Sequence, residues 1–275
     1  MTRRQFVKRA VVASVVLGGA YPFLEAKWCR LTRRTVAIPH LPAAFDGTTV
    51  AYLADVHHGP FVPRAYVRSV VAMTNSLNPD LILLGGDYCH HGTRFVPPVH
   101  EDLSLLRARL GRFAVLGNHD QWDGLEASIA GLADAKIPLL RNSGAWVEKG
   151  GSRLRIAGVG DLWTDRVDVP SAIGAAATDR DAVILLSHNP DVAEHANDPR
   201  IGLILSGHTH GGQVVVPGYG APIVPSAFGQ KYLHGLVQAP HCQVYVSRGV
   251  GTVTPPVRLF CRPEVVWITL TRSIA

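Results

Sequence analysis

The amino-acid sequence predicts a layered α/β domain in which two sheets pack against each other. Apolar runs alternate with helical patterns over the first half of the chain, as is typical of layered α/β folds. From Leu139 onward, short strands broken by Gly and Pro indicate a second sheet. Hydrophobic residues make up 47% of the 275 residues and charged residues 17%, which is a globular composition. No internal repeat or interdomain linker interrupts this pattern, so we expect one domain over residues 35–275.

The N-terminus has the layout of an export signal. A basic head containing Arg3 and Arg4 precedes an apolar stretch over residues 10–20 that ends in small side chains. The arginine pair, followed by Phe and Lys, resembles a twin-arginine (Tat) signal. We expect residues 1–20 to be a signal peptide read by the Tat export machinery, which places the protein in the periplasm or on the outer face of the cytoplasmic membrane. The apolar stretch is short for a membrane span, and its retention as an uncleaved membrane anchor stays an open alternative.

Composition argues against nucleic-acid binding and against a thiolate metal site. The formal charge is +6, but four of the 27 basic residues lie in the signal, so 23 basic residues face 21 acidic ones elsewhere. No stripe rich in Lys or Arg follows, and no nucleic-acid partner is expected. The four cysteines lack a Cys-x-x-Cys spacing, which argues against a zinc ribbon, and a disulfide between Cys242 and Cys261 stays an open alternative.

The elements of the first half follow a basic linker over residues 21–34. Pro63 suits the start of a helix, and Val67 and Val70 then recur at helical spacing. Gly111 is expected to end the next helix. The predicted strands cover residues 35–38, 48–53, 81–84 and 112–116, and the predicted helices cover 63–77, 99–110 and 124–135.

The second half contains more strands than helices. Its apolar runs are short and are separated by Gly and Pro, which suits strands joined by turns. A second sheet packed on the first is the simplest account. The predicted strands cover residues 145–148, 154–158, 183–187, 201–206, 213–216, 243–247 and 265–270, and the predicted helices cover 170–177 and 190–196.

Five of the apolar runs end in side chains that can bind metal ions. Because open α/β sheets bind their ligands at the carboxyl ends of their strands, these side chains are expected to meet. Two carboxylates, four imidazoles and one amide oxygen exceed the four ligands of a structural zinc and suit two ions that share a carboxylate. Nitrogen and oxygen ligands without thiolate fit Mn, Fe or Zn. The seven candidate ligands are Asp55, His57, Asp87, Asn118, His188, His208 and His210.

The order of these motifs resembles that of a known family. Asp55-Val56-His57, Gly86-Asp87, Gly117-Asn118-His119-Asp120, His188 and Gly207-His208-Thr209-His210 resemble the motifs of calcineurin-like metallophosphoesterases over nearly the whole chain beyond the signal. The resemblance implies an α/β four-layer αββα sandwich, with two mixed sheets flanked by helices. Residues 186–191, 207–213 and 247–251 are most similar to an exported bacterial branch that includes UDP-2,3-diacylglucosamine pyrophosphatase-like proteins.

The resemblance also implies roles for the site residues. One metal ion would be held by Asp55, His57 and His210, the other by Asn118, His188 and His208, and Asp87 would bridge them. A hydroxide between the ions would then attack phosphorus in line.

Two further residues receive catalytic roles from the same resemblance. His119 would stabilise the transition state or protonate the leaving oxygen, and Asp120 would orient His119. The segment Tyr88-Cys89-His90-His91 departs from the aliphatic and acidic residues common after Gly-Asp, which leaves substrate contacts open.

The expected function is hydrolysis of a phosphodiester or pyrophosphate bond, in a substrate such as a lipid-linked or nucleotide-sugar phosphate of the cell envelope. A phosphomonoesterase acting through the same site is the nearest alternative. A non-catalytic metal-binding envelope protein is the alternative of a different class. That protein would be expected to lack a ligand or His119, and the sequence lacks neither.

Overall fold

The computed structural model describes residue 5 and residues 19–273 of the chain. The predicted Tat signal and its cleavage point therefore lie almost wholly outside the described residues. Within the described part, no helix has both the length and the apolar character needed to cross a bilayer.

The first sheet has five strands and is mixed. The strand β11 runs parallel to β1 and antiparallel to β2, and the strands from β2 to β4 are parallel to one another. The order is β1 (Arg30–Ile38), β11 (Glu264–Arg272), β2 (Thr49–Leu53), β3 (Leu81–Leu84) and β4 (Gly111–Ala114).

The second sheet has six strands and is also mixed. Its centre, from β6 through β10, is parallel, and an antiparallel strand closes each edge. The order is β5 (Ser143–Lys149), β6 (Ser152–Gly158), β7 (Val183–Leu186), β8 (Ile201–Ser206), β10 (Gln243–Val246) and β9 (Gly235–Gln238).

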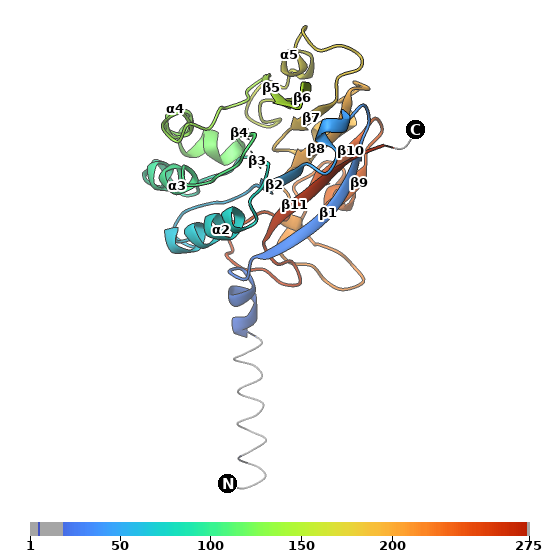
Figure 1. Cartoon of the computed structure of the whole chain (residues 1–275). Helices are drawn as coiled ribbons and strands as arrows, with labels where there is room; N and C mark the ends of the chain where they lie inside the picture. Colours follow the sequence, from blue (N-terminus) through green and yellow to red (C-terminus); the bar gives the residue numbers. More distant parts are fainter. Residues whose placement is uncertain (1–4, 6–18, 274–275) are drawn as a thin grey trace.

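Helices cover the outer faces of both sheets, which confirms the predicted fold class (Figure 1). The helices α2 (Arg64–Ser76), α3 (Val96–Leu103) and α4 (Asn118–Asp134) cover the first sheet. The short helix α5 (Val169–Ile173) and the 3-10 helix η3 (Pro190–Glu194) cover the second.

A continuous apolar core fills the space between the sheets. Tyr52 and Leu83 of the first sheet and Leu203 and Tyr245 of the second belong to the same fully buried cluster. Burial of one such side chain contributes roughly 2 kcal/mol, so the core holds the two sheets in a fixed relation. The carboxyl ends of β2, β3, β7 and β8 are thereby kept close together.

Two strand predictions are wrong, one in its start and one in its sheet, because the two strands pair with each other from opposite ends of the chain. The strand β1 begins at Arg30 and not at Thr35, since it pairs with β11 along its whole length, from Arg30 opposite Glu264 onward. Residues 30–34 of the predicted linker are thus part of the first sheet, and residues 19–25 form a helix. The predicted strand at 265–270 forms β11 of the first sheet, where the sequence suggested the second.

Other element boundaries also differ. The predicted strand at 213–216 is irregular apart from single bridges, and β9 was not predicted. The helix α3 ends at Leu103, so Gly111 begins a strand and does not end the helix. The helix α4 begins at Asn118, six residues before the predicted start, and is interrupted at Gly124, where φ is 152°. Cys242 and Cys261 are both free and buried.

Candidate metal centre

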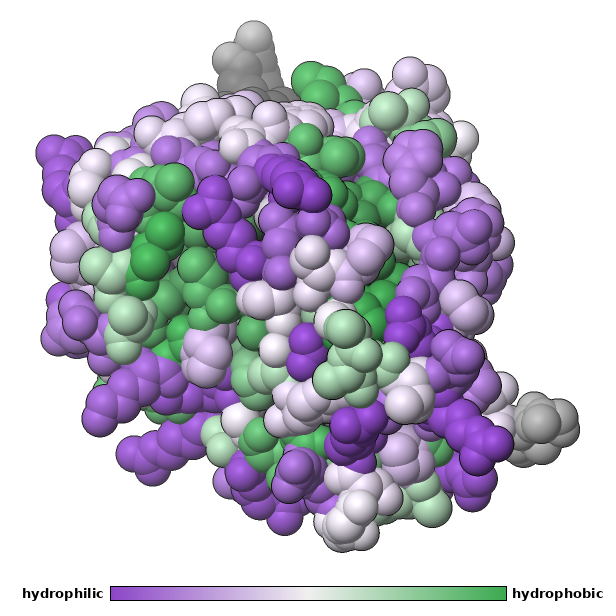
Figure 2. Space-filling model, turned by 90° about the horizontal axis from the view of Figure 1, so that it is seen from above, coloured by the Kyte–Doolittle hydropathy of each residue, from purple (hydrophilic) through white to green (hydrophobic). Residues whose placement is uncertain are grey.

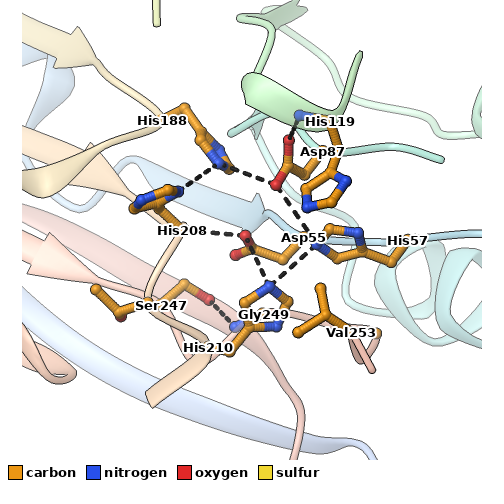
Figure 3. Close-up of polar contacts among 12 residues, drawn as sticks. Asp55, His57, Asp87, His119, His188, His208, His210, Ser247, Gly249 and Val253 are labelled. Atoms are coloured by element: carbon orange, nitrogen blue, oxygen red, sulfur yellow. Dashed lines mark hydrogen bonds and ion pairs between the residues drawn. The ribbon is translucent and has the colours of Figure 1, made fainter. Parts of the chain in front are cut away.

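The structure gathers the predicted metal ligands at the strand ends that face each other across the two sheets (Figure 3). Five loops contribute, one each after β2, β3, β4, β7 and β8. Each ligand side chain is buried, with at most 5% of its surface exposed. The side chains brought into contact are Asp55, His57, Asp87, His188, His208 and His210. Asn118 is buried between Gly117, which packs against Asp87 and His188, and His119, whose N–H donates to Asp87.

The loops that carry the ligands have an unusual backbone. Asp55, His57, Asp87, His208 and His210 all have φ between 46° and 69°, in the left-handed region that non-glycine residues seldom adopt. Each such residue costs of order 1 kcal/mol, and such strain concentrates where side chains must be aimed at a functional site.

Two glycines make room for the carboxylates. A Cβ on Gly207 would lie 2.3 Å from Asp55 Oδ2, and a Cβ on Gly117 would lie 2.3 Å from Asp87 Oδ1. Any larger residue at either position would displace a ligand oxygen.

Asp87 lies between the two groups of ligands. Its Oδ2 is 3.1 Å from His188 Nε2 and 3.4 Å from His57 Nε2, while its Oδ1 accepts the His119 N–H at 2.8 Å. Burial alone would raise the pKa of Asp87, but the charge of His188 and its hydrogen bond to Asp87 outweigh burial and hold that pKa well below its usual value. The ionised form of Asp87 is therefore favoured, and it lies between one imidazole of each ligand group.

The first group contains Asp55, His57 and His210. The Nε2 atoms of His57 and His210 face each other at 3.0 Å, and His210 Nε2 is 3.6 Å from Asp55 Oδ1. Burial lowers the pKa of both imidazoles well below 6.5. Two neutral imidazoles that direct Nε2 at one point beside a carboxylate form a suitable set of ligands for a divalent cation.

The second group contains His188, His208 and Asn118. His188 Nδ1 donates to the Gly85 carbonyl at 2.7 Å, which directs Nε2 toward Asp87. This is the outer hydrogen bond that usually fixes a metal-binding imidazole. His208 Nδ1 lies 3.3 Å from His188 Nε2, and burial lowers the pKa of His208 to about 3.

Orphaned polar atoms show that these residues fit metal ions. Asp55 Oδ2, Asn118 Oδ1 and His208 Nε2 are buried and have no hydrogen-bond partner. A buried polar atom left unpaired costs about 1–3 kcal/mol. All three atoms can offer a lone pair, and they come from both groups, so cations would compensate this cost in each group.

Metal removal should therefore destabilise the protein. With each ion at a hundred times its dissociation constant, binding contributes about 2.7 kcal/mol per site. For a domain of this size we expect chelation to lower Tm by about 5–10 °C per ion lost. Differential scanning calorimetry before and after chelation measures this shift, and added metal should reverse it. If chelation left Tm unchanged, the conclusion that these residues bind stabilising metal ions would be contradicted.

His119 lies at the edge of the centre, and its partners differ from the prediction. Its Nδ1 is 2.9 Å from His90 Nδ1 and 3.7 Å from Asp123 Oδ2. The expectation that Asp120 orients His119 is wrong, because both Asp120 oxygens accept backbone N–H groups, from Asp87 at 2.7 Å, Tyr88 at 2.8 Å and Gly117 at 2.9 Å. Asp120 instead ties the Asp87 loop to α4. Burial and the charge of Asp87 raise the pKa of Asp120 to about 7.

Replacing Asp120 should test this tie. Asp120→Ala leaves three buried N–H groups without acceptors, so we expect the free energy of unfolding to fall by at least about 3 kcal/mol. Urea denaturation measures the change. Asp134→Ala, at an exposed position on the same helix, is the matched control and should alter stability by less than about 0.5 kcal/mol. Equal stabilities of the two variants would show that the three hydrogen bonds contribute little.

The structural role of Arg258 was not predicted from the sequence. Its guanidinium is fully buried and donates to the carbonyls of His210 at 3.0 Å, Cys261 at 3.2 Å and Gly251 at 2.5 Å. Arg258 thus fixes the loop that carries His210. Trp163 packs edge-on against His208, with ring centroids 4.2 Å apart. No motif marks either contact.

The chain is similar to proteins of known family. The model of the calcineurin-like phosphoesterase family matches residues 48–212. The chain is 32% identical to an uncharacterized metallophosphoesterase, YkuE, of Bacillus subtilis, over 98% of both chains. It is 34% identical to the phosphodiesterase YaeI of Escherichia coli, over 98% of this chain and 99% of that one. The NAD nucleotidase NadN of Haemophilus influenzae shares the fold, with a TM-score of 0.51 at 16% identity, over 74% of this chain and 45% of that one.

Proposed function

The chain belongs to the calcineurin-like phosphoesterase family and is a phosphoester hydrolase, and on this premise we propose that it cleaves a phosphodiester or pyrophosphate bond with two divalent metal ions. Asp55, His57 and His210 would hold one ion, and Asn118, His188 and His208 the other. Asp87 would be shared between them.

The position of Asp87 is the observation that carries the proposal. One carboxylate oxygen contacts an imidazole of each ligand group, and each group also contains a buried atom with an unpaired lone pair. Ions bound there would supply Lewis-acid polarisation of the phosphoryl oxygens and a lowered pKa for the attacking water. A single structural zinc would leave several of the seven ligands without a role.

His119 is the residue that would donate a proton to the leaving oxygen. Its side chain is 19% exposed, so it borders both the buried ligands and the solvent. His90 and Asp123 hold the ring through its Nδ1, beside the ligand His57, whose ring centroid lies 4.9 Å from that of His119. An imidazole held in this way can carry a proton to the departing oxygen.

The relatives and the N-terminal sequence support the choice of substrate class. YaeI, at 34% identity over almost the whole chain, carries the name phosphodiesterase. The Arg3-Arg4 pair and the apolar residues after it support Tat export to the periplasm or to the outer face of the cytoplasmic membrane. A phosphodiester or pyrophosphate of the cell envelope, lipid-linked or carried on a nucleotide sugar, is the substrate class that suits this location.

Hydrolysis by reconstituted protein tests the proposal. Metal-stripped protein would be loaded separately with Mn, Fe or Zn and assayed with bis(4-nitrophenyl) phosphate, a UDP-sugar and 4-nitrophenyl phosphate. We expect at least one metal to restore turnover, with kcat/KM at least tenfold higher for the diester or the pyrophosphate than for the monoester. A preference for the monoester would favour a phosphomonoesterase, and no turnover with any metal would contradict the proposal.

A further inference from the structure

An apolar cavity lies directly beside the metal centre. Its volume is about 360 Å³, within the range of small-molecule sites, and His210 and Thr209 form part of its wall. The opposite wall is the segment 253–257. Figure 3 places Val253 of that wall next to the imidazole of His210. The cavity therefore adjoins the first ligand group.

The cavity offers a bound group little except hydrocarbon contact. No Asp, Glu, Lys or Arg side chain is among the described residues that line it. More than half of the lining residues are Pro or Val, together with Ile223.

The polar side chains in the lining are already paired. Thr209 Oγ1 donates to the Leu233 carbonyl at 2.9 Å. Gln213 Nε2 donates to the carbonyls of Val253 and Pro255 at 3.3 Å, and its Oε1 accepts the Val253 N–H at 2.9 Å. Because these groups are engaged, a sugar or a base would find few hydrogen-bond partners in the cavity.

Gln213 also connects the 253–257 wall of the cavity to the loop that carries His210. It lies three residues after His210 and is buried, with φ of 55°. Its three hydrogen bonds clamp the segment that begins at Val253 onto the loop that carries His210. The cavity is thus built by the same loop that positions a metal ligand.

The mouth of the cavity lies in an apolar part of the surface. Ile223 at the rim is 78% exposed, and Tyr219 in the same loop is 70% exposed. A backbone hydrogen bond links the segment before Tyr219 to a second exposed apolar residue. Val215 N–H donates to the Leu259 carbonyl at 2.9 Å, and the next residue, Phe260, is 62% exposed.

The same surface continues to the N-terminal helix. Phe260 N–H donates to Glu25 Oε2 at 3.1 Å, at the end of the helix over residues 19–25, which projects from one end of the molecule in Figure 1. Phe23 and Leu24 of this helix are exposed. Figure 2 views the opposite end, where hydrophilic side chains cover much of the surface, with apolar ones between them.

We propose that this cavity is a subsite for the hydrocarbon chain of an amphiphilic phosphoester, an alkyl or acyl chain carried close to the phosphorus bound at the metal centre. The inference rests on the proposed function and narrows its substrate class. Burial of each methylene should strengthen binding about three- to fourfold until the chain fills the cavity.

Binding of alkylphosphonates tests the subsite without turnover. Isothermal titration of metal-loaded protein with methyl-, butyl- and octylphosphonate should show affinity rising with chain length, by at least about a hundredfold from methyl to octyl. Equal affinities along the series would overturn the proposal, whether or not the protein hydrolyses any ester. A lack of hydrolysis with a steep chain-length dependence would instead contradict the proposed function and leave the subsite supported.

Variants at the rim and in the wall locate the binding. Ile223→Asp and Val257→Phe should each abolish most of the gain from methyl to octyl while leaving the affinity for methylphosphonate within about twofold. Leu105→Asp, at an exposed apolar position outside the cavity, is the control and should keep the gain. A gain that survives both cavity variants would place the hydrocarbon elsewhere and overturn the proposal.

A comparison of free and vesicle-held ligands distinguishes whether the bound hydrocarbon chain belongs to a soluble amphiphile or to a membrane lipid. Octylphosphonate free in solution and a long-chain alkylphosphonate held in phosphatidylglycerol vesicles would be compared for the wild type and for Ile223→Asp. Binding of the free ligand that is lost in the variant indicates a soluble amphiphile. Variant-sensitive binding of the vesicle-held ligand alone indicates a membrane lipid. Either outcome supports the hydrocarbon subsite, and variant-insensitive binding in both arms overturns it.

Discussion

Asp87→Asn should reduce kcat by roughly a thousandfold or more and lower the metal content of the purified protein. The amide retains the shape of the carboxylate and can still accept the His119 N–H, so the fold should persist. It lacks the negative charge that lies 3.1 Å from His188 Nε2 and 3.4 Å from His57 Nε2 and that would be shared between two cations. Steady-state kinetics combined with elemental analysis of the same sample measures both effects.

Asp80→Asn is the matched control for this change. Asp80 is a buried carboxylate at the opposite end of the same strand, where it accepts the Thr49 N–H and pairs with Arg109. Its replacement should lower stability but leave metal content and kcat within about twofold of the wild type. Near-normal turnover by Asp87→Asn would remove the basis of the two-ion account.

His119→Ala should reduce kcat by about 10²- to 10⁴-fold, which is the usual contribution of a positioned general acid. His119 is not among the seven predicted ligands, so metal content should stay at the wild-type level. The loss should shrink for substrates with a good leaving group such as 4-nitrophenolate, because such a group departs without a proton. The ratio of kcat values for 4-nitrophenyl and alkyl esters measures this difference.

His91→Ala provides the control for the His119 variant. His91 is an exposed histidine whose ring nitrogen lies 3.3 Å from Thr254 Oγ1. Its ring centroid lies 3.8 Å from that of His90 and 6.1 Å from that of Phe61, so its described ring contacts reach His90 but not His119. Its removal should leave the ratio of the two esters unchanged. If His119→Ala loses metal along with activity, His119 is a ligand and the assignment as a proton donor is wrong.

The fold was predictable where burial is complete and the signal is local. The apolar run 201–206 matches β8 residue for residue, since its backbone lies in the middle of a sheet and glycine follows it. The run at 265–270 shows the limit of such reasoning. A buried apolar run predicts a strand but not its partners, and β11 pairs with β1 from the far end of the chain.

The site was predictable from the strand ends, but the contacts among its residues were not. The family resemblance implied that Asp120 orients His119, its neighbour in the sequence. Neighbouring residues on a helix point in different directions, whereas residues four apart share a face. Placing the start of α4 at Asn118 would have indicated Asp123, four residues after His119, as the contact that the structure shows. Arg258 could not have been found, because its partners are backbone carbonyls brought to it by folding.

The number of metal ions bound per chain tests the central claim most directly. Metal-stripped wild-type protein would be titrated with Mn or Zn, and the bound ions counted by elemental analysis after removal of free metal. If Asp87, which contacts His57 of one ligand group and His188 of the other, is shared by two ions, the protein should bind two ions per chain, and Asp87→Asn should bind one or fewer. A wild-type protein that saturates at a single ion, or that binds none, would contradict the two-ion centre.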